Sequence, residues 1–376
     1  MDFALFFEWL IKGIVWVLVL LGGFAYLTLY ERKALARIQV RVGPNRAGPW
    51  GILQPIADAI KLIFKEELIP ARADKLLFFL APVVTVVPAV VITAVVPWGS
   101  EPLKLFGREI TWYIADVNVG VLYIMSVASI AVYGIVLAGW SSNNKYAMLG
   151  GLRASAQMVS YELALGLSFV TAILLAGTMR MTEIVEAQKS LWFVLLQPVG
   201  TAIFLIATLA EVNRAPFDMP EAEQELTAGY HTEYSGMKFA LLFMAEYVKM
   251  IAISAIGATL FFGGYLGPDI TTIPFIGQYL TWLSPFMGPI YMFLKVIILL
   301  FGMIWVRATF PRIRYDRLMA FGWKILLPLS LALVFITAAG ILLDMLWLIP
   351  ALSLLAGFFV IAMMYRTLRR KEYARS

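Results

Sequence analysis

The chain of 376 residues contains no cysteine and a single histidine, His231. Without cysteine it can form no disulfide and can offer no thiolate to zinc or to an iron–sulfur cluster, and one histidine argues against a metal or haem site. It also lacks a recognisable nucleophile beside a base, which argues against covalent catalysis by this chain alone. We therefore expect any redox centre that serves this protein to lie in a partner.

Charged residues are scarce as well. They make up 14% of the chain against 61% hydrophobic residues, whereas a typical globular protein has about 25% charged and about 45–50% apolar residues. Uncharged runs repeatedly approach or exceed the length of about 18 residues that a membrane span requires. This predicts an all-α polytopic membrane protein with a single membrane domain over residues 1–376. The N-terminus has no basic leader or small-residue cleavage site, so we expect the first span to be retained.

Nine uncharged runs predict nine transmembrane helices. They cover residues 12–30, 76–97, 116–139, 158–178, 190–210, 239–263, 286–306, 324–343 and 346–365. The last two are separated only near Asp344, so one long bent element is an alternative. Segments after the odd-numbered runs hold 23 of the 30 lysines and arginines, which predicts the N-terminus outside and the C-terminus inside. The basic tail fits a topology anchor better than a lipid-specific site.

The first predicted inner loop covers residues 31–75. Its glycine-proline turns fit neither nucleotide-binding fingerprint. From residue 55 to 68 the period becomes helical, with Ile56 and Ile60 on one face and Asp58 on another. We expect a short amphipathic helix along the membrane surface, whose apolar face could equally cover the mouth of a cavity for an amphiphilic molecule.

The second inner loop, residues 211–238, is strongly acidic. Between Glu211 and Gly236 it holds six carboxylates and one arginine, Arg214, for a formal charge of −5 in a chain of charge +6. Such a loop either faces a basic partner or handles protons, because clustered carboxylates titrate as a coupled set. The third inner loop, residues 307–323, is rich in arginine. Its charge fits the positive-inside rule, and its guanidinium groups could also pair with the acidic loop or with a partner.

Four further charges fall within predicted spans, where an ionised side chain is expensive and by default suggests function. Glu162 lies about one turn inside the fourth span, where a helix-end acid reached by water is the alternative. Glu246 and Lys249 share one face of the sixth span and form either a structural ion pair or part of a proton path, and Lys295 lies midway along the seventh. The predicted proton path comprises Glu162, Glu211, Asp218, Glu221, Glu223, Glu225, Glu233, Glu246, Lys249 and Lys295.

Long segments between residue 31 and about residue 328 resemble, in order, the signature segments of one family. They include E-R-K-A-L-A-R-I-Q-V-R-V-G-P-N-R-A-G, A-E-V-N-R-A-P-F-D-M-P-E-A-E-Q-E-L, T-E-Y-S-G and R-A-T-F-P-R-I-R-Y-D-R-L-M. The family is the membrane subunit of respiratory complex I, the proton-pumping NADH:quinone oxidoreductase, that joins the membrane arm to the peripheral arm and is called the H subunit or subunit 1. Met219 stands where leucine is common, and the ninth span is extra relative to the shorter mitochondrial members.

The resemblance implies that the chain forms much of a quinone-binding chamber and that its acids link this chamber to antiporter-like subunits. Positions that resemble chamber or entrance residues are Arg32, Arg41, Asp58, Phe243 and Arg307. Quinone would be the substrate, with FMN and iron–sulfur clusters in partner subunits. The implied partners are the peripheral-arm quinone-site and iron–sulfur subunits and the small and antiporter-like membrane subunits, in a bacterial plasma membrane and without nucleic acid. His231 matches no element of the family pattern that we can assign.

Two other classes of protein compete with this interpretation. A related protein could anchor a hydrogenase-type or other non-NADH donor complex, although such proteins usually match the acidic loop less completely. A free-standing secondary transporter would show internal symmetry between its halves, and the sequence shows no such repeat.

Overall fold

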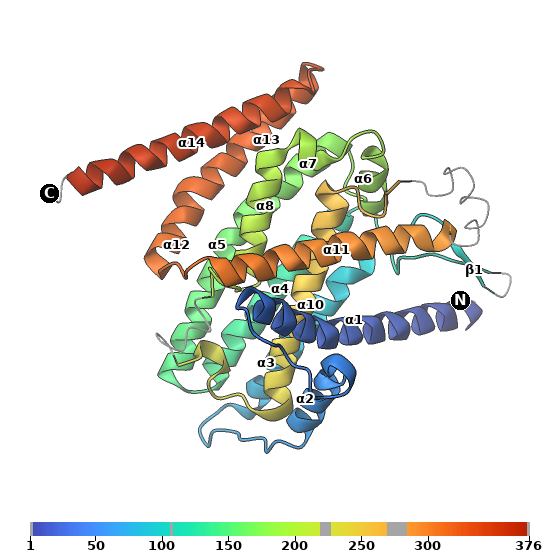
Figure 1. Cartoon of the computed structure of the whole chain (residues 1–376), viewed down its shortest axis with the longest axis vertical. Helices are drawn as coiled ribbons and strands as arrows, with labels where there is room; N and C mark the ends of the chain where they lie inside the picture. Colours follow the sequence, from blue (N-terminus) through green and yellow to red (C-terminus); the bar gives the residue numbers. More distant parts are fainter. Residues whose placement is uncertain (1–2, 106–107, 219–226, 269–283, 374–376) are drawn as a thin grey trace.

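The computed structural model describes residues 3–105, 108–218, 227–268 and 284–373. The protein is a bundle of helices with one small hairpin on its surface (Figure 1). The hairpin pairs β1 (Leu103–Leu105) with β2 (Arg108–Ile110) in antiparallel register. The long helices are α1 (Phe3–Ile38), α3 (Lys75–Val91), α4 (Gly120–Ser141), α5 (Lys145–Ala176), α10 (Gly236–Phe261), α11 (Ser284–Thr309), α13 (Leu327–Leu342) and α14 (Leu348–Tyr373). Shorter helices are α2 (Gln54–Ile63), α6 (Met181–Ala187), α7 (Phe193–Leu196), α8 (Pro198–Glu211) and α12 (Tyr315–Phe321).

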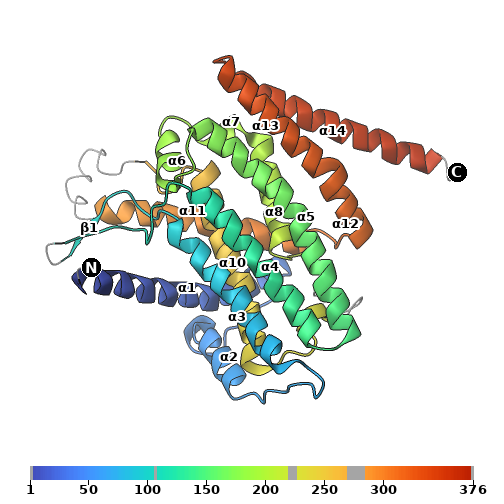
Figure 2. The same cartoon turned by 180° about the vertical axis from the view of Figure 1, so that it is seen from behind.

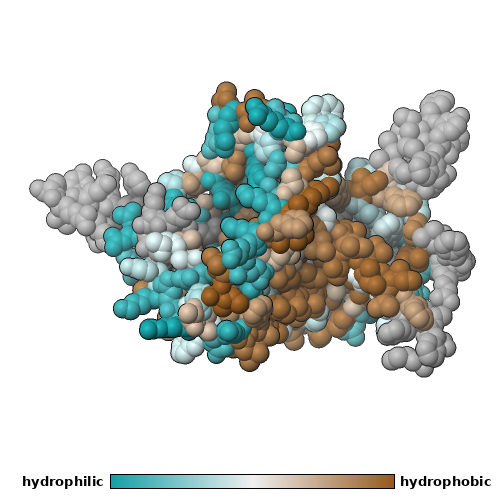
Figure 3. Space-filling model, turned by 90° about the horizontal axis from the view of Figure 1, so that it is seen from below, coloured by the Kyte–Doolittle hydropathy of each residue, from teal (hydrophilic) through white to brown (hydrophobic). Residues whose placement is uncertain are grey.

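The prediction of an all-α polytopic membrane protein is confirmed. Seven helices in the described part of the chain are long and apolar enough to cross a membrane, and two shorter apolar helices, α8 and α14, coincide with the other two predicted runs. Their outward-facing side chains form a broad hydrophobic surface bordered by hydrophilic residues (Figure 3). Which side of the membrane each terminus occupies stays a prediction.

Helix α10 lies at the centre of the bundle. In Figure 1, α1 and α11 cross in front of it, and Figure 2 shows α3, α4 and α5 on the opposite side. Its side chains are buried almost continuously from residue 242 to residue 261. Small residues let the surrounding helices approach closely, as membrane helices often do. A Cβ atom on Gly134 of α4, for example, would lie only 2.2 Å from Thr85 Oγ1 of α3.

Helix α5 begins much earlier than the hydrophobic run suggested. It starts at Lys145, where the Asn144 side chain accepts a hydrogen bond from the Tyr146 amide at 2.9 Å and so caps the helix. Polar residues such as Arg153 and Gln157 interrupt the apolar run without interrupting the helix. Glu162, which was predicted about one turn inside the fourth span, therefore lies near the middle of α5, and its depth in the membrane stays a prediction.

The fifth predicted span is broken. Helix α7 ends at Leu196, and α8 begins at Pro198, which occupies a favourable first-turn position. Between them Gln197 adopts a non-helical conformation with φ −130° and ψ 63°. Its amide is fully buried and donates a hydrogen bond to Thr337 of α13, which satisfies part of the polarity that the break exposes.

The last two helices are separate elements, so the alternative of one bent helix is wrong. The chain turns at Asp344, whose φ of 55° lies in the left-handed region. Helix α14 then folds back against α13 and α8 (Figure 1). A close approach at the turn requires Gly340, because a Cβ atom there would lie 2.4 Å from Ile349 Cγ1.

The predicted surface helix is present as α2. Pro55 lies in its first turn, and the apolar residues Ile56, Ile60 and Ile63 are about half exposed along one face. The turns before it require glycine, since Gly48 and Gly51 have φ values of 72° and 75°. Helix α1 continues to Ile38, into the predicted inner loop. This extension brings Glu31 and Arg32 onto a rigid helix beside α2 and α11.

Candidate functional site

Two arginines from different segments meet at one buried carboxylate, Glu31. This residue is 3% exposed near the end of α1, and Arg307 of α11 donates a hydrogen bond to its Oε1 atom. Arg214, from the loop after α8, places Nη1 3.5 Å from the same oxygen and its guanidinium 4.2 Å from the ring centre of Tyr247 in α10. Glu31 therefore joins the first inner loop to the acidic and arginine-rich loops.

The acidic loop is also held directly by the arginine-rich loop. Arg312 Nη2 lies 3.1 Å from Asp218 Oδ2, and the Ile313 amide donates to the Pro216 carbonyl at 3.1 Å. Asp218 is 3% exposed, and this burial raises the pKa of its carboxyl although Arg312 opposes the shift. Of the interpretations offered for the arginine-rich loop, pairing with the acidic loop is thus confirmed for one of its arginines.

Glu246 of α10 receives two groups from the acidic loop on a single oxygen. The Tyr230 hydroxyl donates to Glu246 Oε1 at 2.9 Å, and His231 Nε2 lies 3.4 Å from the same atom. All three residues are buried. The histidine ring lies 4.0 Å from the Tyr230 ring and meets Phe239 edge-on at 5.5 Å.

A tight backbone contact positions Tyr230 and His231. They belong to the short turn η3 (Gly229–His231), which packs on the first turns of α5. A Cβ atom on Gly150 of α5 would lie 2.6 Å from the Gly229 Cα atom, so only glycine permits this approach. Thr227, Ala228 and Gly229 have φ values of 48°, 72° and 57°, which turn the chain sharply before η3.

Lys249 forms its ion pair with Glu211 of α8, so the structure does not support the alternative of a structural ion pair between Glu246 and Lys249. Lys249 Nζ lies 2.5 Å from Glu211 Oε1, and both side chains are almost fully buried. A small cavity separates this pair from the Tyr230–Glu246 pair and has about 20 Å³ for the centre of a water molecule. That is room for about one water, which could hydrogen-bond to both pairs.

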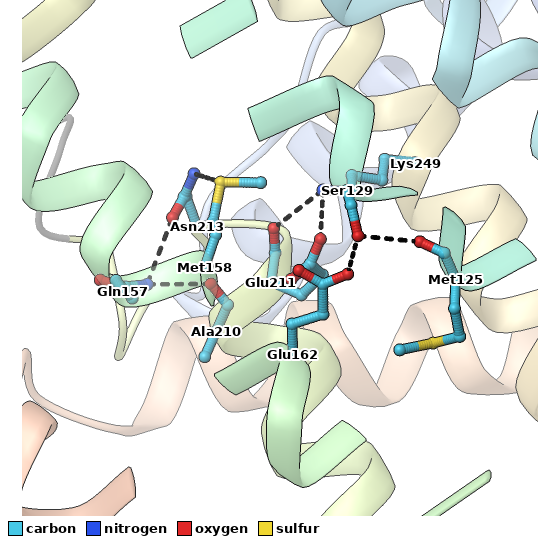
Figure 4. A network of polar contacts seen from close by, with 9 residues as sticks. All are labelled: Met125, Ser129, Gln157, Met158, Glu162, Ala210, Glu211, Asn213 and Lys249. Atoms are coloured by element: carbon cyan, nitrogen blue, oxygen red, sulfur yellow. Dashed lines mark hydrogen bonds and ion pairs between the residues drawn. The ribbon is translucent and has the colours of Figure 1, made fainter. Parts of the chain in front are cut away.

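Glu162 lies on the other side of Glu211. Figure 4 shows their carboxyl groups, from α5 and α8, turned toward one another. Ser129 of α4 donates a hydrogen bond to Glu162, and Gln157 holds the end of α8 by donating to the Ala210 carbonyl at 2.9 Å. Within the described ranges, no three histidine or acidic side chains converge so as to hold a metal ion.

The remaining predicted path residues lie apart from these contacts. Asn144 donates to Glu233 at 2.6 Å at the start of α5. Lys295 Nζ donates to the carbonyls of Gly264 and Leu266, just beyond the far end of α10, which lies about 18 Å from Lys249 along the helix axis. Glu221, Glu223 and Glu225 lie outside the described residues.

Four of the five predicted chamber residues lie on neighbouring elements. Arg32 of α1 pairs with Asp58 of α2 at 2.7 Å, and Arg307 binds Glu31 one residue earlier in α1. Phe243 packs its ring against Tyr247 at 4.7 Å, and Tyr247 in turn carries the guanidinium of Arg214. Arg41 is exposed, and its guanidinium donates to Gln39, away from these contacts.

The loop after α2 is tied to the end of the acidic loop. Lys238 Nζ lies 2.6 Å from Glu67 Oε2 and 4.1 Å above the ring of Phe79. The Leu68 amide donates to Ser235 Oγ at 3.0 Å. Direct contacts therefore join the loop that follows α2 to the start of α10.

Sequence reasoning missed Glu31, Tyr230, His231 and Ser129 as members of this network. Glu31 directly follows a long apolar run, and Tyr230 and His231 sit within the acidic loop, so their positions carried some signal. Which side chains they would meet depends on interhelical packing that no local pattern encodes.

Comparison with known proteins adds independent information. Residues 11–338 match the family described as NADH dehydrogenase, a match that ends before α14. One H subunit of the NADH-quinone oxidoreductase of Geobacter metallireducens is 50% identical over 313 residues, 83% of this chain and 90% of that protein. The NADH-ubiquinone oxidoreductase chain 1 of Chondrus crispus is 50% identical over 340 residues, 90% of this chain and 98% of that protein. The corresponding NADH-quinone oxidoreductase protein of Rhodospirillum rubrum is 49% identical over 323 residues, 86% of this chain and 90% of that protein.

Proposed function

Because the chain belongs to the family of the H subunit and chain 1 of the membrane-bound NADH-quinone oxidoreductase, we propose that it lines the quinone-binding chamber and carries the acidic path that couples quinone reduction to proton translocation. The observation that carries this proposal is a row of ionisable side chains through the bundle, most of which are buried, although Arg312 is exposed and Arg307 and Glu162 are only partly buried. In order, the row comprises Arg307, Glu31, Arg214, the Asp218–Arg312 pair, Glu246, the Lys249–Glu211 pair and Glu162.

Such a row is expensive to bury. An ionised side chain deep in a membrane protein is stable only when it is paired or reached by water, and removing one partner of a buried pair costs about 3–5 kcal/mol. A bundle that needed only stability would fill these positions with apolar residues. Carboxylates, lysine and water are the materials of proton relays, and here Glu246 and Lys249 of α10 and Glu211 of α8 line one water-sized cavity.

At one end of the row lie the predicted chamber residues of α1, α2 and α11, which are Arg32, Asp58 and Arg307. Reduction of a quinone takes up protons and changes the charge of the chamber. Two guanidinium groups share the Glu31 carboxylate, so a charge change near Arg307 alters the balance between Arg307 and Arg214. Since Arg214 belongs to the acidic loop, this redistribution reaches Asp218 and Glu246 through Coulomb interactions.

Electrons must enter from outside the chain, which has no cysteine to hold an iron–sulfur cluster. We place FMN and the clusters in partner subunits and expect contacts with the peripheral arm at the inner loops, and with small and antiporter-like membrane subunits along the bundle. The bacterial plasma membrane stays a prediction, because the relatives include Chondrus crispus as well as Geobacter metallireducens. The names of these relatives favour an NADH-linked complex over a hydrogenase-type complex.

The decisive experiment neutralises the path in the intact complex. We expect Glu246→Gln and Glu211→Gln to reduce coupled quinone reduction and proton pumping at least tenfold, while the partner subunits still transfer electrons from NADH to an artificial acceptor. Glu186→Gln, at an exposed position in α6, is the matched control and should pump normally. Normal pumping by Glu246→Gln would refute the relay.

A further inference from the structure

We propose that His231 is a second proton-holding group of the Glu246 site, which holds the proton that Glu246 passes on. This inference rests on the proposed function and deepens it. His231 is the only histidine of the chain and had no role in the family pattern, yet its ring is buried against the carboxylate at the centre of the acidic row.

The imidazole of His231 lies beside the carboxylate of Glu246. Nε2 lies 3.4 Å from Glu246 Oε1, and the side chains are 5% and 9% exposed. Tyr230 donates to the same oxygen at 2.9 Å. Among the contacts of Glu246 in the described residues are therefore a phenol, which stays neutral at physiological pH, and an imidazole, a group that can carry a charge there.

The imidazole is held in place and cannot simply rotate away. The His231 amide donates to the Ala228 carbonyl at 3.2 Å, and its carbonyl accepts from Tyr234 at 3.0 Å. The ring packs between Tyr230 and Phe239. The backbone of η3 rests directly on Gly150, which positions the main chain of His231, and the contacts with the Tyr230 and Phe239 rings limit the rotation of its imidazole.

The charged groups around this pair come from each neighbouring element. Asp218, in the loop after α8, interacts electrostatically with Glu246 and is balanced by Arg312 and Arg214. Across the cavity lies the Lys249–Glu211 pair. Glu233 lies two residues beyond His231 and accepts from Asn144.

The proposed step is a transfer within the pair. With imidazolium at His231, Glu246 is a carboxylate; the Nε2–H bond breaks, an O–H bond forms at Oε1, and the nitrogen keeps its electron pair. The result is a neutral imidazole beside a carboxylic acid, with the same number of protons. Glu246 then passes the proton toward the cavity, and His231 is reloaded from the loop side.

The test compares His231→Gln with Tyr230→Phe in the intact complex in vesicles. We measure the coupled pumping rate of each variant, divided by that of the unaltered complex, from about pH 6 to about pH 8. For His231→Gln this ratio should be near one at the alkaline end and fall about tenfold toward the acidic end, because an imidazole side chain can take up a second proton as the pH falls and an amide cannot. For Tyr230→Phe the ratio should be reduced equally at every pH.

A His231→Gln ratio that does not change with pH would overturn the inference and leave His231 a packing residue. If that variant fails to assemble, His231→Asn serves as the second neutral amide in the same measurement. The two proposals fail separately. A flat ratio combined with uncoupling by Glu246→Gln removes only the role of His231, whereas normal pumping by Glu246→Gln removes the relay itself.

Discussion

Two lysines in this bundle illustrate how differently one residue type can be used inside a membrane protein. Lys249 lies near the middle of α10 and Lys295 near the middle of α11. Lys249 meets the carboxylate of Glu211 at 2.5 Å and faces a cavity shared with Glu246. Lys295 meets two backbone carbonyls, at 2.7 and 2.6 Å, and the face of the Trp192 ring at 4.5 Å.

The difference lies in what the partner can do with a proton. A carboxylate can accept the proton of Lys249 and pass it on, whereas a peptide carbonyl and an indole ring cannot. Lys295 instead satisfies carbonyls that follow the end of α10, where a cation also complements the helix dipole. Both lysines were predicted as path residues. The geometry supports a relay role for Lys249 and a structural role for Lys295.

The largest effect is expected from Lys249→Met. This change leaves the Glu211 carboxyl buried without its cation, and breaking a buried pair in this way costs about 3–5 kcal/mol unless the carboxyl takes up a proton. We expect proton pumping to be lost and the assembled complex to be less stable, as measured by proton uptake in vesicles and by thermal inactivation.

The double variant Lys249→Met with Glu211→Gln provides the control. It removes both charges, so assembly and thermal stability should largely recover while pumping stays absent. Recovery of pumping in the double variant would show that the pair serves only stability and would remove the contrast with Lys295.

The next effect in size is expected from Gly150→Ala. The added Cβ would press on Gly229 at 2.6 Å and displace η3, which carries Tyr230 and His231. Overpacking of this kind typically costs about 1–3 kcal/mol, and displacement of the two donors should lower the coupled rate. Gly302→Ala in α11 is the matched control, since a Cβ atom there meets nothing within 4 Å. Equal coupled rates for both variants would show that the relay does not depend on this backbone contact.

A smaller effect on pumping is expected from Lys295→Met, which should act on stability alone. Each of the two charge-assisted hydrogen bonds is worth about 1.5–3 kcal/mol and the cation–π contact about 0.5–1 kcal/mol, so their loss should lower the thermal stability of the assembled complex. The number of protons pumped per electron should not change. Lys189→Met, at an exposed position nearby, should alter neither quantity. A lowered proton-to-electron ratio in Lys295→Met would place Lys295 back in the path.

Local composition predicted the apolar helices and the charges within them. Uncharged runs are long and chemically distinct, and they coincide with the seven long and two shorter apolar helices of the described residues. The amphipathic period predicted α2, and the cost of charge in a span singled out Glu162, Glu246, Lys249 and Lys295. These are local signals, because each depends only on the composition of its own segment.

The failures involve contacts between segments. The pairing of Lys249 with Glu211 is decided by how α8 packs on α10, and α5 begins at Lys145, after the cap residue Asn144, well before the apolar run begins at residue 158. The inclusion of His231 depends on two glycines, Gly150 and Gly229, that lie far apart in the sequence but touch in the fold. Such contacts carry no periodic signature.

The loop after α2 and the loop after α6 are predicted to lie on opposite sides of the membrane. Testing their sides requires no change of activity. Because the chain has no cysteine, a single cysteine at Arg72, after α2, or at Lys189, after α6, reports its own location. Both positions are exposed. If the excess of lysine and arginine sets the orientation, a membrane-impermeant thiol reagent should label Lys189→Cys in intact cells and Arg72→Cys only in inverted vesicles. The reverse pattern would place the acidic loop outside, where it could not meet the electron-donating partners, and the proposed coupling would have to be abandoned along with the orientation.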